Sequence, residues 1–154
     1  MSVNLEDNLP AVKYVGLRMP IISGNPATAT LNNSQSGKTV LFDRAAGITY
    51  TLPAPVPGTF FTFVVTTSVT SNNHKIITDV AATLLQGAIT SATTTASVFE
   101  SVIGSSNISV TMNGTTTGGL VGTELKFLCL SSTLWQVSGV NFTSGTTATP
   151  FANT

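Results

Sequence analysis

Charged side chains are scarce in this sequence of 154 residues: six are basic, six are acidic, and the formal net charge is zero. An ordinary soluble domain has about a quarter of its residues charged, whereas the fraction here is 8%. Because the chain has no basic patch to neutralise phosphates, we expect no nucleic-acid partner. The few acidic residues form no cluster typical of a metal site, and no cofactor is expected.

Cysteine and long apolar runs are also nearly absent. The single cysteine, Cys129, excludes an internal disulfide and predicts that the protein is made in a reducing compartment. No run of about 18 apolar residues occurs, so we expect neither a membrane-spanning helix nor a membrane partner. The first residues lack the basic start and apolar run of a secretory signal, so none is expected.

The shortage of catalytic residue types argues against an enzyme. His74, the only histidine, begins a predicted strand, and Asp79 would face the opposite side of that strand. We therefore expect a solvated or edge-strand histidine rather than a catalytic one. Asp43 and Arg44 are expected to form a solvated turn after a strand, and Cys129 is expected to be a small core residue.

Threonine, serine, asparagine and glycine supply the polarity that charge does not. Solubility normally comes from mixed surface charge and a net charge away from zero. A chain covered by small neutral side chains would make a poor free monomer at high concentration. Such a surface makes sense when much of it lies against other subunits. The composition therefore predicts an oligomer or a component of a lattice.

Short alternating segments separated by turn signals predict an all-β fold of about nine strands. Segment 59–67 is expected to be central and buried, and 124–130 is expected to form a hairpin with 133–138. Residues 80–106 leave open a helical turn at 81–86. The expected architecture is a single β-sandwich or a small, jelly-roll-like β-barrel. Its core is predicted to contain Phe61, Phe63, Leu125, Phe127 and Trp135, with Trp135 in the core rather than on a sugar-binding platform.

Shifts in composition divide the chain into three parts. Residues 1–26 hold three prolines and a third of all charges, so we predict an extended N-terminal arm. The β-domain is expected at 27–142 and a polar C-terminal tail at 143–154. Within the arm, 12–17 alternates weakly and could add as a strand to a neighbouring subunit. The candidate contact residues are Val12, Tyr14, Leu17, Met19, Ile21 and Phe151.

The order of the predicted strands carries a resemblance to a known class of proteins. The segments concerned are SGKTVLFD (36–43), AAGITYTLP (45–53), GTFFTFVV (58–65), HKIITD (74–79), LQG (85–87) and LWQVSG (134–139). In this order the chain resembles the β-rich virion proteins of tailed bacteriophages, particularly small capsid decoration (cement) proteins and related head-fibre or tail-fibre modules. The resemblance covers about residues 28–140 and leaves the arm uncovered.

The resemblance implies a structural protein without catalytic residues. It implies a homotrimer that binds the major capsid protein at local three-fold positions on the outside of a phage head and stabilises it, after synthesis in the host cytoplasm. The alternatives are a head-fibre or tail-fibre module that binds a host surface glycan, and a major capsid or other virion component. A short chain with its own start methionine and an arm favours decoration over a fibre tip.

Overall fold

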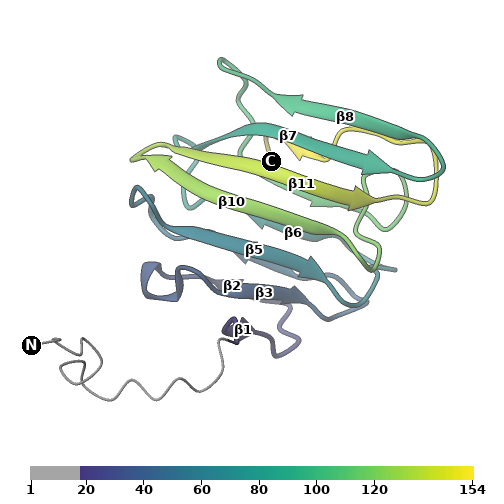
Figure 1. The fold of residues 1–154 in the computed structure, drawn as a ribbon, viewed down its shortest axis with the longest axis horizontal. Coiled ribbons are helices and arrows are strands. Elements are labelled where there is room, and N and C mark those ends of the chain that lie inside the picture. Colours follow the sequence, from purple (N-terminus) through teal and green to yellow (C-terminus); the bar gives the residue numbers. More distant parts are fainter. Residues whose placement is uncertain (1–17) are drawn as a thin grey trace, which may run out of the picture.

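The computed structural model describes residues 18–154, which fold into two facing β-sheets (Figure 1). The larger sheet has seven strands in the spatial order β1 (Ile21–Ile22), β3 (Thr39–Phe42), β5 (Phe60–Val65), β10 (Glu124–Ser131), β11 (Leu134–Phe142), β7 (Leu84–Ala92) and β8 (Ala96–Ser101). The smaller sheet has the order β12 (Phe151–Ala152), β9 (Ser109–Met112), β6 (His74–Ile77), β4 (Thr49–Thr51) and β2 (Thr28–Thr30). The described part contains one short 3-10 helix, Asn33–Gln35, and no α-helix. The prediction of an all-β sandwich is confirmed.

The first six strands alternate between the two sheets, so the chain winds as a flattened coil. Strands β1, β3 and β5 lie parallel in the larger sheet. Strands β2, β4 and β6 lie parallel in the smaller sheet. Each pair of consecutive strands therefore forms one turn of the coil, stacked on the next by backbone hydrogen bonds.

The second half of the chain closes the sandwich with longer strands. β10 pairs antiparallel with β5 and with β11, which confirms the predicted hairpin. β7 then pairs parallel with β11 and antiparallel with β8. The segment 81–86, for which a helical turn was an open alternative, instead leads into β7. The structure has twelve strands among the described residues, more than the nine predicted.

The core lies between the two sheets and contains every aromatic and aliphatic residue that was predicted for it. Phe61, Phe63, Leu125, Phe127 and Trp135 are each at most 1% exposed. Their alternation along β5, β10 and β11 places them on the inner face of the larger sheet. From the smaller sheet they are met by Tyr50, Ile76, Val110 and Met112, which are fully buried.

Both ends of the predicted β-domain need correction. Ile21–Ile22 already belongs to the larger sheet, and the backbone N–H of Thr39 donates to the carbonyl of Pro20 at 2.9 Å. The carboxylate of Asp43 accepts hydrogen bonds from the backbone N–H groups of Gly24 and Asn25 at 3.1 Å each. The predicted arm therefore joins the domain at least from residue 20 onward. At the other end, the predicted tail contributes β12 to the smaller sheet.

Candidate interaction surface

The outer face of the larger sheet carries more than half of the large exposed apolar side chains in the described part of the chain. Strand register brings alternate residues of all seven strands onto this face. Seven of them are large apolar side chains between 39% and 61% exposed: Ile21, Phe60, Val98, Leu128, Leu130, Val140 and Phe142. Isolated exposed apolar residues are common on proteins, but several on one sheet face indicate a surface for contact.

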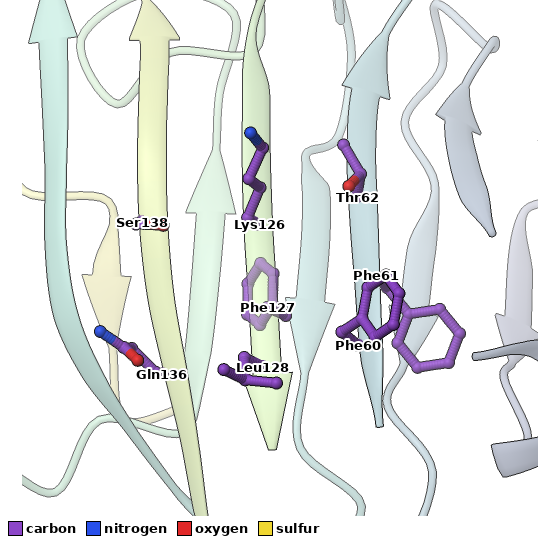
Figure 2. A pocket seen from close by; sticks show the side chains of 8 residues that line it. All are labelled: Phe60, Phe61, Thr62, Lys126, Phe127, Leu128, Gln136 and Ser138. Atoms are coloured by element: carbon purple, nitrogen blue, oxygen red, sulfur yellow. The ribbon is translucent and has the colours of Figure 1, made fainter. Parts of the chain in front are cut away.

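A shallow hollow of about 420 Å³ lies near the middle of this face, over β5, β10 and β11. Figure 2 shows Phe60, Leu128 and Gln136 at one level across the three strands, which agrees with the pairing of Phe60 to Leu128 and of Leu128 to Gln136. At the next level, Thr62, Lys126 and Ser138 supply an amine and two hydroxyl groups, so the hollow has an apolar and a polar end.

Charge on this face is minimal and almost balanced. Among the strands of the larger sheet, only Glu100, Glu124 and Lys126 are charged. Lys126 Nζ lies 3.3 Å from Glu124 Oε1, and both side chains are more than half exposed. An exposed pair of this kind contributes little to stability. It does cancel most of the local charge, so little charge would need to be desolvated if another protein covered the face.

The opposite outer face of the sandwich differs in chemistry. Thr28 and Thr30 on β2 lie beside Thr49 and Thr51 on β4 in the parallel register, and their side chains point away from the core. This face is therefore covered by hydroxyl and methyl groups at the β2–β4 end. The contrast between the two faces favours the larger sheet as the one that contacts a partner.

The predicted contact residues are placed as follows. Met19 and Ile21 are both 60% exposed, and Ile21 lies on the outer face beside Thr39. Phe151 is a correction, because it is only 6% exposed and belongs to the core, where β12 pairs with β9. It cannot dock on another subunit without unfolding that edge. Val12, Tyr14 and Leu17 lie outside the described residues.

Most residues of the outer face were not predicted as contacts. Segment 59–67 has apolar residues on both faces and was therefore expected to be buried on both sides. In the structure Thr59, Phe61, Phe63 and Val65 are buried, while Phe60 is 46% exposed. The sequence did contain one sign that this face is solvated. Lys126 lies two residues before Leu128 on β10, so the two side chains share a face, and a lysine on that face indicates contact with water.

Among the described residues, the titratable groups with shifted pKa values lie in the interior. Burial raises the pKa of the Cys129 thiol, which is 1% exposed and was correctly predicted as a core residue. Burial, and to a lesser extent the charge of Asp43, raises the pKa of Tyr50 to about 12, and its hydroxyl donates to the carbonyl of Leu41 at 2.9 Å. Both groups are held in their neutral forms, so neither is poised as a nucleophile.

His74 contradicts the prediction of a solvated or edge-strand position. It is fully buried in β6, between β4 and β9, and its ring lies 4.5 Å from that of Phe42. Nδ1 accepts a hydrogen bond from the backbone N–H of Ile48 at 3.3 Å, and Nε2 contacts the carbonyl of Thr67 at 3.0 Å. Because Nδ1 must accept, the neutral ring carries its proton on Nε2 and donates it to Thr67. The histidine is a structural link between loops.

Acid is expected to destabilise the protein through His74. Burial lowers the pKa of the ring, opposed by the hydrogen bond to Thr67 and the charge of Asp43. Because the unfolded chain then binds more protons than the folded one, the free energy of unfolding should fall as the pH drops below about 6.5. The slope should reach at most about 1.4 kcal/mol per pH unit. Denaturant unfolding at several pH values between about 5 and 7.5 measures it.

The matched variant for this measurement is His74→Gln, which keeps a donor and an acceptor but does not titrate. Its overall stability is expected to be lower, yet its slope over the same pH range should be flatter than that of the unmodified protein. Equal slopes in the two proteins would contradict the assignment, because the pH dependence would then come from other groups.

Neither a metal centre nor a family relationship identifies a function. Within residues 18–154 no group of three or more histidine, cysteine, aspartate or glutamate side chains is placed to hold a metal ion. The same residues include no helix of the length and apolarity needed to cross a membrane. Comparisons of the chain with protein-family models, with curated proteins and with solved structures found no match. The surface itself is therefore the basis for a functional argument.

Proposed function

We propose that this chain is a structural virion protein of a bacteriophage, a capsid decoration protein that acts by covering and stabilising a larger assembly. In this proposal the protein forms a homotrimer, and the outer face of its larger sheet binds the major capsid protein. The observation that carries the proposal is the nearly uncharged outer face with its seven exposed apolar side chains. Burial of such a face is favourable at roughly 25 cal/mol per Å² of apolar surface.

The hollow over β5, β10 and β11 gives this surface a centre. Interface energy is concentrated in a few large side chains near the middle of a contact. Phe60 and Leu128 flank the hollow, and Lys126 and Gln136 can satisfy polar groups of a partner at its rim. An apolar centre with a polar rim is the usual arrangement at protein interfaces.

A head-fibre or tail-fibre module that binds host glycan is the second candidate. The observation in its favour is that the hollow is lined by the exposed ring of Phe60 and, on the far side of β10, by the amide of Gln136 and the hydroxyl of Ser138, groups that can stack on and hydrogen-bond to a sugar. Trp135 contributes nothing to this candidate, because its side chain is fully buried. Binding to host cells without binding to empty heads would favour the glycan candidate.

The first expected result of the proposal is a homotrimer in solution. Scarce charge and exposed apolar side chains would leave a monomer poorly soluble, so association with other copies of the chain is expected. Light scattering coupled to gel filtration should give about three times the monomer mass of 15.9 kDa. A stable monomer at tens of micromolar would count against the trimer.

The second expected result concerns the outer face directly. Leu128→Lys places an unpaired charge beside the hollow, and covering that charge would be costly, so attachment to empty heads should weaken by about tenfold or more. Co-sedimentation of the full chain with heads measures this effect. Thr51→Lys adds the same charge to the outer face of the smaller sheet and should leave attachment unchanged. Equal binding by the two variants would mean that the larger sheet is not the contact face.

A further inference from the structure

Within residues 18–154, one end of the sandwich is left without a covering strand in both sheets. In the described residues β1 has a single neighbour, β3, and β2 has a single neighbour, β4. The two edges belong to the first turn of the coil and therefore lie at the same end of the molecule. Beneath them, Ile22 and Ala29 are only partly buried where they pack against the core. An uncovered parallel coil end of this kind exposes both backbone groups and the margin of the core.

The free backbone groups of β2 can be identified from its pairing. The carbonyl of Ala27 accepts from Thr49 at 3.0 Å, and the N–H of Leu31 donates to Thr51 at 2.9 Å. Alternate residues of a strand direct their N–H and C=O groups to opposite sides. Thr28 and Thr30 therefore direct theirs away from β4, where no described strand meets them.

Residues 1–17 join the described part of the chain at this same end of the sandwich. Seventeen residues precede Arg18, and Ile21 begins the edge strand β1. Segment 12–17 has the weak alternation of a strand. Fully extended, the seventeen residues span up to about 56 Å. This is enough to reach the corresponding end of an adjacent molecule.

Pairing of segment 12–17 with β2 of its own molecule is disfavoured by the short connection. Within the coil, the chain uses residues 31–38 to cross from β2 to β3 and residues 52–59 to cross from β4 to β5. Between Leu17 and Pro20, whose carbonyl is already paired with Thr39, only Arg18 and Met19 remain. Such a connection spans about 11 Å at full extension. Because two packed sheets are about 10 Å apart, almost no length would remain for the chain to turn from one sheet into the other.

We propose that the open end binds segment 12–17 of a second copy of this chain, added as a strand beside β2. The added strand would pair with the free N–H and C=O groups of Thr28 and Thr30 and cover the half-buried Ala29. Exchange of such strands around a closed ring links the copies of an oligomer, and backbone hydrogen bonds provide much of the affinity. This inference rests on the self-association in the proposed function. It assigns that association to the open end rather than to the outer face.

Residue-resolved hydrogen exchange on the full chain, measured without phage heads, tests the proposal. The amides of Thr28 and Thr30 should exchange slowly although no strand of the same molecule pairs with them. In the full-length variant Val15→Pro, the added strand loses a donor and its regular geometry. Exchange at Thr28 and Thr30 should then become at least about tenfold faster. The amide of Leu31, which is bonded to Thr51, is the internal control and should change little.

A mixing experiment decides which copy supplies the strand. Isotope-labelled Val15→Pro chains are refolded together with an excess of unlabelled, unmodified chains, and exchange is followed in the labelled copies. Slow exchange restored at Thr28 and Thr30 supports a strand supplied by a second copy. Exchange that stays fast would overturn the proposal, because the strand beside β2 would then be supplied by the same chain. If Thr28 and Thr30 exchange as fast in the unmodified protein as in Val15→Pro, the proposal is also overturned, because the edge of β2 would then be free. None of these outcomes depends on attachment to heads.

Discussion

Replacing Phe63 with alanine is expected to lower the free energy of unfolding by about 3–5 kcal/mol, the usual cost of removing a buried phenylalanine ring. Phe63 is 1% exposed and lies near the centre of the larger sheet. Its ring centroid lies 5.2 Å from that of Phe127 in an edge-on arrangement and 5.9 Å from those of Phe42 and Tyr50. Truncation leaves a cavity that touches both sheets, and Tyr50 cannot move to fill it without giving up its hydrogen bond to Leu41.

The control for this measurement is Phe60→Ala, the same substitution on the same strand but on the outer face. Phe60 is 46% exposed, so its truncation should cost less than about 1 kcal/mol. Chemical denaturation of the two variants compares the faces of β5 directly. A loss below about 1 kcal/mol at Phe63, or equal losses at the two positions, would contradict the assignment of the inner face.

The strands and their inner faces could be predicted because alternation survives in the sequence. Along β10, Leu125, Phe127 and Cys129 alternate with more polar or exposed neighbours, and all three are buried. The short turn between β10 and β11 made the hairpin predictable as well. Such signals are local, and they hold wherever a strand has one buried face and one solvated face.

The arrangement of the strands was not predictable from the same signals. A period of two residues is common to parallel and antiparallel strands, so it does not distinguish a coil from a series of hairpins. The connections 31–38 and 52–59 contain the turn residues that would also suit a sandwich with Greek-key loops. The two-residue strands β1 and β12 lie in segments whose composition is that of loops, and tertiary pairing alone defines them.

Strand β7 shows how a tertiary contact decides between two local alternatives. The sequence left a helical turn open for segment 81–86, which is followed by Gly87. In the structure Gly87 has φ +137°, and a Cβ atom there would lie 1.9 Å from the carbonyl oxygen of Val137 on β11. The glycine therefore permits β7 and β11 to pair closely. This role of Gly87 depends on β11, which is distant in the sequence, so it could not be predicted from the local pattern.

Polar groups in the interior were the hardest features to predict. His74 was expected at the surface, and its neighbours Asn73 and Lys75 are polar as well, whereas no position was predicted for Asn141. Both are fully buried. Each satisfies its hydrogen bonds with groups from other segments, so burial does not carry the penalty that their polarity alone suggests. The pattern of a single strand contains no sign of those partners.

Replacing Asn141 with leucine is expected to lower the free energy of unfolding by about 3 kcal/mol, because a buried backbone N–H group and a half-buried backbone carbonyl would lose their partners. The Asn141 Oδ1 atom accepts from the N–H of Gly119 at 3.0 Å, and Nδ2 donates to the carbonyl of Thr117 at 2.9 Å. The side chain also contacts the hydroxyl groups of Thr123 and Ser91. The amide thus ties β11 to the loop that follows β9.

Asn113→Leu is the matched control for Asn141→Leu, because Asn113 also bonds to backbone groups of that loop but is exposed. Its Oδ1 accepts from the N–H groups of Thr115 and Thr117 at 2.9 and 3.1 Å, and water can replace it there. We expect the control to cost about 1 kcal/mol, as for the loss of a surface cap. Denaturant unfolding of both variants gives the comparison. Equal costs would mean that Asn141 is no more shielded from water than Asn113, and that the loop opens readily.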